Sequence, residues 1–236
     1  MKTIRIQIVE DDADYRYLME RTLEKEPRFE LCSSCEDSET ALSAALNENP
    51  DIVLMDLNLS GKELDGIETA RAIRLNTNAR VVILTSYEDY ETIVHASTRA
   101  FASAYLYKSS FSTLVPTLIE TAQSVTSQAH LICSILLAPL TDAERSVLQY
   151  TLGQDVGLHS SSKTIANQQT GILRKLGLSN KRELIHIFRA YGYEALPDEQ
   201  IWDVSAQKTD ENAAQKLPPP RRKNALPSET GMIDIR

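Results

Sequence analysis

Four apolar runs in the first half of the chain each end in a reactive polar residue, and this pattern constrains the fold most. The runs are residues 4–9, 52–55, 81–84 and 104–107. The residues that follow them are Glu10-Asp11-Asp12, Asp56, Thr85-Ser86 and Lys108, in that order. The carboxyl ends of neighbouring parallel strands meet in one crevice. The pattern therefore predicts carboxylates, a hydroxyl and an ammonium gathered at one edge of a sheet.

The first 125 residues alternate strand-like and helix-like patterns, as βαβ units do. Strands are expected at residues 3–9, 29–33, 51–56, 81–85 and 103–107. Helices lie between them, the last two over about 90–99 and 113–125. Pro116 fits only the first turn of that last helix. The fold class predicted for residues 1–125 is a five-stranded, parallel, doubly wound α/β domain.

The rest of the chain predicts a small all-α domain. Residues 126–139 form an apolar connector, which we interpret as a buried extension of a helix, the alternative being a segment that packs against a neighbour domain or a partner. Residues 140–196 begin with Thr141 and Glu144 spaced as a capping box, and helices are expected over about 163–176 and 181–191. Residues 197–236 combine a Pro-Pro-Pro run with a basic triplet and lack apolar periodicity, which predicts a disordered tail.

Charge and cysteine content favour a cytoplasmic regulatory protein. Residues 1–125 carry 12 basic and 21 acidic side chains, whereas residues 140–196 carry 7 basic and 5 acidic ones. This slight basic excess is far below a strong nucleic-acid footprint. Three widely spaced cysteines argue against a disulfide framework. The start of the chain lacks a signal-peptide core, and residues 131–140 are too short to span a bilayer, so no membrane partner is expected.

The acidic crevice suits phosphoryl chemistry. The Asp56 carboxylate is the predicted nucleophile, which attacks the phosphorus of a phosphohistidine and forms an acyl phosphate. A cation must offset repulsion between the carboxylates and the phosphoryl group, and Mg²⁺ prefers oxygen ligands of this kind. Asp11 and Asp56 are the expected direct ligands, with Glu10 or Asp12 acting through water. The backbone carbonyl of Asn58 is placed to supply another oxygen.

Three further residues complete the predicted site. Lys108 supplies a positive charge to balance the metal-bound anion, and Thr85 supplies a hydroxyl that bonds a phosphoryl oxygen. Movement of Thr85 toward that oxygen leaves space that the ring of Tyr105 can fill. Alone, each has an ordinary interpretation, such as a strand-end cap or an exposed lysine. Their conjunction at strand ends favours the functional interpretation.

Residues 1–125 resemble the receiver domain of two-component response regulators. The matching segments are residues 9–12, 53–59, 84–86 and 105–108. The resemblance implies phosphorylation of Asp56 by a sensor histidine kinase, with Mg²⁺ required, and a switch through Thr85 and Tyr105. It implies self-modification and not an enzyme acting on an outside substrate. One departure is that Phe101 and Ala104 stand where the family has glycines.

Residues 140–190 resemble the LuxR-type (NarL/FixJ-like) helix-turn-helix output domain. The matching pieces are residues 140–148, 161–165 and 172–182. The resemblance implies phosphorylation-dependent homodimers that regulate transcription, with the helix after Lys163 in the DNA major groove. The candidate DNA contacts are Lys163, Asn167, Gln168, Thr170, Arg174 and Lys175.

The segment before that helix departs from the family and leaves two functions open. Residues 154–160 are several residues shorter than the first helix of the motif and contain Gly157. Either the domain still binds DNA, or the shortened domain binds a protein partner under the same phosphorylation switch. A third interpretation is a metal-dependent phosphatase of the haloacid dehalogenase type. It requires a second aspartate where Asn58 stands, and it is the weakest of the three.

Overall fold

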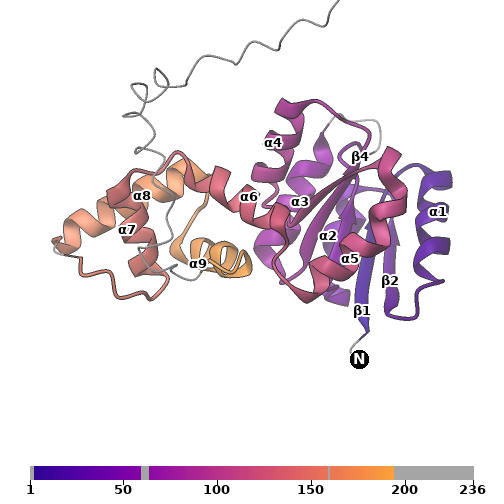
Figure 1. Cartoon of the computed structure of the whole chain (residues 1–236), viewed down its shortest axis with the longest axis horizontal. Helices are drawn as coiled ribbons and strands as arrows, with labels where there is room; N and C mark the ends of the chain where they lie inside the picture. Colours follow the sequence, from indigo (N-terminus) through magenta and orange to yellow (C-terminus); the bar gives the residue numbers. More distant parts are fainter. Residues whose placement is uncertain (1–2, 60–63, 159, 194–236) are drawn as a thin grey trace, which may run out of the picture. The chain divides into compact units, whose positions relative to one another are not determined.

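A five-stranded parallel sheet organises the first half of the chain (Figure 1). The structure is a computed structural model that describes residues 3–59, 64–158 and 160–193. The sheet order is β2-β1-β3-β4-β5. The strands are β1 (Ile4–Val9), β2 (Phe29–Cys35), β3 (Ile52–Met55), β4 (Arg80–Thr85) and β5 (Ala104–Tyr107). The predicted fold class is confirmed, and β2 alone extends clearly beyond its expected range, because its register with β1 shifts after Ile6 and pairing continues to Cys35.

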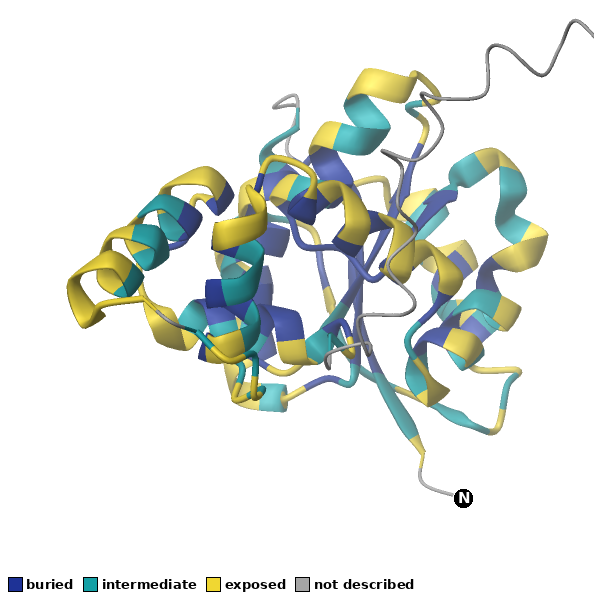
Figure 2. Ribbon diagram, turned by 60° about the vertical axis from the view of Figure 1, so that its left-hand side comes forward, coloured by how far each residue is buried: buried dark blue, intermediate teal, exposed yellow. Residues whose placement is uncertain are grey.

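Helices cover both faces of the sheet, which makes it doubly wound. The helices of this half are α1 (Ala13–Leu23), α2 (Ser38–Glu48), α3 (Asp65–Asn76), α4 (Tyr90–Arg99) and α5 (Leu114–Gln123). Apolar side chains of α1 and α5, such as Met19 and Leu118, form one core with Ile6, Leu54 and Val82. The other face contributes Val53 and Ile83, among others, to a core with α2, α3 and α4. Figure 2 shows the strands as largely buried and the outer sides of the helices as exposed.

The apolar connector is a separate helix, α6 (Ser127–Leu137), and not an extension of α5. The break between them is stabilised by Thr126, whose hydroxyl donates to the Ser103 carbonyl at 2.8 Å and accepts from the amide of Ala129 at 3.0 Å. Ile132 and Cys133 of α6 are buried, whereas Leu131 on its other side is 66% exposed. The connector therefore contributes part of the core.

Three helices follow: α7 (Asp142–Thr151), α8 (Ser162–Leu176) and α9 (Lys181–Ala190). The predicted capping box starts α7, with the amide of Thr141 donating to Glu144 Oε2 at 2.8 Å. Between α7 and α8, residues 152–158 and 160–161 contain no helix. In this described segment, the helix that directly precedes the second helix of a helix-turn-helix pair is therefore missing, although α8 packs against α7.

The core on the α2–α4 face continues into the last three helices. Leu148, Ile172 and Phe188 belong to the same cluster of buried side chains as Val53 and Ile83 of the sheet. Residues 1–195 accordingly group into one compact unit. The predicted disordered tail, residues 197–236, lies outside the described residues.

Polar contacts join α9 to the end of α3 and to the segment before β5. The hydroxyl of Tyr191 donates to the carbonyl of Ala102 at 3.0 Å. Nε2 of His186 lies 3.0 Å from the carbonyl oxygens of both Arg74 and Thr77. Carbonyl oxygens only accept, so the proton of this imidazole sits on Nε2 in these bonds. The end of α3 is thereby held against α9.

Phe101 explains how the chain manages without a glycine before β5. Its φ is +52°, in the left-handed region that favours glycine. Such a backbone costs about 1–3 kcal/mol in a residue with a side chain. The ring is fully buried in the shared core, and the Arg71 guanidinium lies 4.6 Å from its centre. Burial of an aromatic side chain contributes a stabilisation of similar size, about 1.5–3 kcal/mol.

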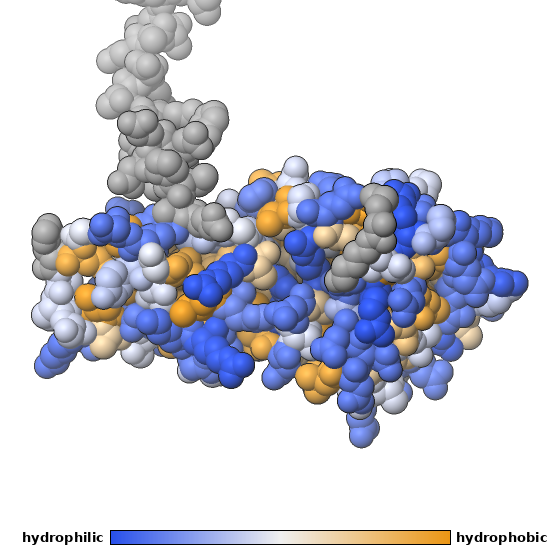
Figure 3. All heavy atoms as spheres, turned by 90° about the horizontal axis from the view of Figure 1, so that it is seen from below, coloured by the Kyte–Doolittle hydropathy of each residue, from blue (hydrophilic) through white to orange (hydrophobic). Residues whose placement is uncertain are grey.

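The described surface carries few large apolar side chains. Tyr90 is 77% exposed, and Leu131 is the next most exposed of these residues. On the face drawn in Figure 3, hydrophobic residues form small groups among hydrophilic ones. In the described part of the chain, no helix has the length and apolarity needed to cross a membrane.

Gly66 sets how closely α3 approaches the end of β3. A Cβ atom added to Gly66 would lie 2.0 Å from the carbonyl oxygen of Asp56. The amide of Gly66 also donates to the carbonyl of Leu57 at 3.0 Å. No side chain fits at this contact, so glycine is required if Asp56 is to keep its place.

We expect Gly66→Ala to lower the free energy of unfolding by about 1–3 kcal/mol, because backbone must shift to admit the methyl group. Urea unfolding followed by circular dichroism measures the change. The comparison variant is Gly171→Ala in α8, where the added Cβ meets a side-chain oxygen of Glu144 at 2.9 Å and no backbone of a neighbouring segment. Equal stability of the two variants would contradict the close packing at Gly66.

Candidate functional site

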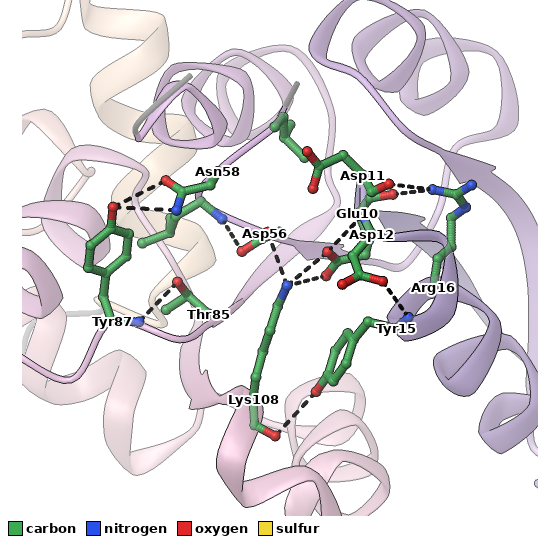
Figure 4. A network of polar contacts seen from close by, with 12 residues as sticks. Glu10, Asp11, Asp12, Tyr15, Arg16, Asp56, Asn58, Thr85, Tyr87 and Lys108 are labelled. Atoms are coloured by element: carbon green, nitrogen blue, oxygen red, sulfur yellow. Dashed lines mark hydrogen bonds and ion pairs between the residues drawn. The ribbon is translucent and has the colours of Figure 1, made fainter. Parts of the chain in front are cut away.

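The ends of β1, β3 and β5 bring one cation between two carboxylates (Figure 4). Nζ of Lys108 lies 2.8 Å from Oε1 of Glu10 and 3.1 Å from Oδ2 of Asp56. Both carboxylates are buried, with Glu10 1% and Asp56 6% exposed. The sheet order places β1 next to β3, so the parallel register alone brings Glu10 and Asp56 together. The pattern of strand-end residues thus becomes a compact charged cluster.

Glu10, Asp11 and Asp56 form an acidic group that can hold a metal ion. Each offers a carboxylate oxygen, and these oxygens lie within 4.8 Å of one another. The Asp12 side chain is not part of this group. It caps α1 by accepting hydrogen bonds from the amides of Asp14 and Tyr15. Asp11 is exposed, whereas its two partners are buried.

Burial dominates the electrostatics of this group. It raises the pKa of Glu10 to about 7, even though Lys108 acts in the opposite direction. Burial also raises the pKa of Asp56, against the attraction of Lys108. For Lys108, burial lowers the pKa, but the hydrogen bond to Glu10 and the charge of Asp56 outweigh it, and the net direction is upward. The cluster therefore favours an added cation.

The donor set fits Mg²⁺. All three groups are carboxylates, and hard divalent cations prefer oxygen ligands. Oε2 of Glu10 lies 2.7 Å from Nζ of Lys108, yet it receives no well-directed hydrogen bond. This buried oxygen therefore has the charge of Lys108 beside it but accepts no hydrogen bond. Glu10, Asp11 and Asp56 are the side chains that would hold the ion.

Thr85 and Tyr105 lie beside this cluster on β4 and β5. The Thr85 hydroxyl is buried and accepts weakly from the amide of Tyr87 at 3.4 Å. The Tyr105 ring points inward, with its hydroxyl donating to the carbonyl of Tyr87 at 2.8 Å. The side-chain oxygen of Asn58 accepts from the amide of Leu64 at 3.0 Å. The structure thus places the predicted receiver residues on or directly after the strands β1, β3, β4 and β5.

Two neighbours of the site escaped the sequence analysis. Nη1 of Arg16 donates to the carbonyl of Glu10 at 2.6 Å and fixes the backbone that carries the acidic residues. The ring of Tyr15 lies 4.7 Å from Nζ of Lys108. Both belong to the first turn of α1, where an arginine or tyrosine is ordinary. No sequence signal singles them out.

The candidate DNA contacts lie on α8, apart from this crevice. Lys163, Asn167, Thr170 and Arg174 are exposed, and Gln168 is half-buried. Lys175 forms an ion pair with Glu144, a residue that also caps α7. This pairing occupies one of the few cations of the helix.

Comparison with known proteins agrees with the geometry of the first domain. Residues 6–119 match the response regulator receiver domain family. A nitrate/nitrite response regulator protein homolog from Haemophilus influenzae is 27% identical over 188 residues, which cover 78% of this chain and 82% of that protein. The transcriptional regulatory protein DegU from Brevibacillus brevis is 33% identical over 44% of each chain. The chain thus spans less than half of DegU.

Among solved structures, the RcsB response regulator of Salmonella typhimurium is 18% identical, with a TM-score of 0.48. The match covers 81% of this chain and 99% of that one. Residues 6–119 are a response regulator receiver domain. The relatives of the chain include LuxR/NarL-type response regulators.

We expect the metal-free protein to lose stability as the pH rises from about 5 to about 8. The folded-state pKa of Glu10, about 7, lies above its ordinary value of 4.5, so the native state binds this proton more tightly than the unfolded chain does. This contribution is present below the ordinary pKa and is lost as the pH rises through the folded-state value.

Urea unfolding in a chelator at several pH values measures this effect, and Glu10→Gln should remove its part of the slope. The exposed Glu39→Gln is the matched control and should follow the wild type. A slope that is the same in the wild type and in Glu10→Gln would remove Glu10 as its source.

Proposed function

We propose that this chain is a phosphorylation-dependent response regulator in which Asp56 accepts the phosphoryl group of a sensor histidine kinase. The observation that carries the proposal is the position of Asp56 between Lys108 and the other acidic residues, with Oδ2 of Asp56 3.1 Å from Nζ of Lys108. A carboxylate in such a place has both a charge partner and the ligands for a cation beside it.

The chemistry follows from these neighbours. An oxygen of Asp56 attacks the phosphorus of phosphohistidine, an O–P bond forms, and the N–P bond breaks with its electron pair returning to the imidazole. Bound Mg²⁺ supplies charge neutralisation for the incoming phosphoryl group. Glu10, Asp11, Asp56 and the backbone carbonyl of Asn58 would hold that ion. Lys108 balances the remaining negative charge.

The switch passes through Thr85 and Tyr105. The Thr85 hydroxyl, now only weakly engaged, turns to donate to a phosphoryl oxygen. Tyr105, held by its bond to the Tyr87 carbonyl, adjusts to the space that Thr85 leaves. These changes bias the surface formed by β4, α4 and β5 between two states. The protein modifies itself and has no outside substrate.

The output that the resemblance implies is homodimerisation and DNA binding, which would regulate transcription in the cytoplasm. The relatives support this output, because they include proteins described as transcriptional regulators. In this proposal α8 enters the major groove, and Lys163, Asn167, Gln168, Thr170 and Arg174 supply its contacts.

A second output is binding of a protein partner, and two observations favour it. The described segment between α7 and α8 contains no helix, so α8 lacks the partner that crosses the DNA backbone in a helix-turn-helix. The ion pair between Lys175 and Glu144 also reduces the charge available for phosphate contacts. The receiver would switch in the same way, but α7 to α9 would present a protein-binding surface.

Incubation of the full chain with acetyl phosphate and Mg²⁺ should add one phosphate, and Asp56→Asn should abolish it, because the attacking oxygen is lost. Intact-mass spectrometry provides the measurement. Asp14→Asn is the matched control on the exposed side of α1 and should be labelled normally. A chelator should prevent labelling. Equal labelling of Asp56→Asn and wild type would refute the role of Asp56.

The two outputs separate in a salt titration of binding to genomic DNA fragments, with and without acetyl phosphate. DNA binding by α8 predicts sequence-selective complexes that weaken steeply with salt. Lys163→Gln and Arg174→Gln should each weaken those complexes, whereas Lys25→Gln, in the receiver domain, should not. Absence of any complex in both phosphorylation states would exclude DNA and leave the protein-binding output.

A further inference from the structure

A cavity of about 450 Å³ lies where α9 faces the end of α3. It is not part of the phosphorylation site, whose residues are absent from its lining. The residues that line it and bear on the argument are Arg74, Asn78, Arg182, His186 and Arg189. Its volume is within the range of pockets that hold small molecules, about 300–1,000 Å³.

The lining of this cavity, which we call the arginine pocket, is strongly basic. Arg182 and Arg189 are seven residues apart on α9 and therefore share one face of the helix. Arg74 adds a third guanidinium from α3. None of the described residues that line the pocket is acidic. Three arginine residues therefore line one pocket without a carboxylate among them.

Arg74 is the exceptional member of the set. It is only 1% exposed. Nε donates to the carbonyl of Phe101 at 3.3 Å, and Nη1 donates to the carbonyl of Ala79 at 3.0 Å. The Tyr191 ring lies 5.9 Å from the guanidinium carbon. Nη2 is buried and has no hydrogen-bond partner.

No described residue forms an ion pair with Arg74. Burial lowers the pKa of this guanidinium, and the charge of Arg80 lowers it further. Taking such a charge out of water is costly unless an opposite charge compensates it. Arginines are nevertheless charged at all ordinary pH values. The pocket thus combines an uncompensated buried cation with two more cations at its wall.

The pocket is also held in shape before any ligand arrives. Nε2 of His186 lies 3.0 Å from the carbonyl oxygens of both Arg74 and Thr77, which fixes α9 to the end of α3. The arginines of the two helices therefore do not have to be brought together. Binding of a ligand there therefore does not include the entropic cost of ordering the two helices.

We propose that the arginine pocket binds a small molecule through a phosphoryl group. Guanidinium groups recognise phosphate with paired, charge-assisted hydrogen bonds, and the exposed side chains of Arg182 and Arg189 are free to form them, with the buried charge of Arg74 behind them. The remaining volume exceeds what one inorganic phosphate needs, so the phosphoryl group is expected to belong to a phosphate ester. Such a ligand contacts α3 and α9 together and stabilises their contact.

Isothermal titration calorimetry of the full chain tests this proposal, in a chelator and at constant ionic strength. Adenosine monophosphate and inorganic phosphate are the two phosphoryl probes, and adenosine is the uncharged control. Both phosphoryl probes should bind and adenosine should not. Tighter binding of the ester identifies a phosphorylated small molecule as the ligand class. Tighter binding of inorganic phosphate overturns the ester assignment.

Variants locate the binding. The double variant Arg182→Gln with Arg189→Gln should weaken both phosphoryl probes at least about tenfold, since each charge-assisted bond contributes that much or more. Lys181→Gln, on the same helix but outside the pocket lining, is the matched control and should bind as wild type does. Asp56→Asn should also bind normally, which keeps this test separate from the phosphorylation site.

Three results would overturn the proposal. The first is no heat of binding for either phosphoryl probe at millimolar concentrations. The second is equal affinity in the wild type and the double variant. The third is displacement of the probe from the wild type by a short DNA duplex at a lower concentration than the probe, which would assign the pocket to nucleic acid.

Discussion

The ion pair of Lys108 with Glu10 and Asp56 is the interaction on which the receiver site depends. It joins the ends of three strands, and all three side chains are largely withdrawn from water. Two buried carboxylates in contact repel each other, and a single ammonium offsets this only in part. The site is therefore stable enough to form and still receptive to a divalent cation. Charge balance thus links fold and chemistry at this edge of the sheet.

Much of this site could be predicted from sequence because it follows from local rules. A strand that ends in a polar residue places that residue at the sheet edge, whatever the rest of the chain does, and this fixes Glu10, Asp56, Thr85 and Lys108. Arg16 could not be predicted, because its contact with the carbonyl of Glu10 depends on how a long side chain folds back.

The contacts between distant segments could not be predicted from sequence either. Arg71 of α3 donates to the carbonyl of Gly177, and Tyr191 donates to the carbonyl of Ala102. Each joins residues separated by some 90 positions or more, and backbone carbonyls leave no pattern in a sequence. The start of a separate helix at the connector was likewise not visible, because the Thr126 cap is recognised only once its bond to Ser103 is seen. The shortened segment before α8, in contrast, could be predicted, because residues 154–160 are too few to form the first helix of a helix-turn-helix motif.

The buried cluster shared by the sheet and α7 to α9 affects how the protein unfolds. Phe101 lies in that cluster with its ring wholly enclosed, together with Phe188 of α9. Side chains that pack in one continuous core lose their contacts together. We therefore expect the sheet with its helices and the helices α7 to α9 to unfold in one cooperative transition and not one after the other. Amide protons in α9 would then exchange with solvent about as slowly as those in β4. If phosphorylation at Asp56 weakens the packing of this core, the cooperativity of unfolding of the whole unit should change.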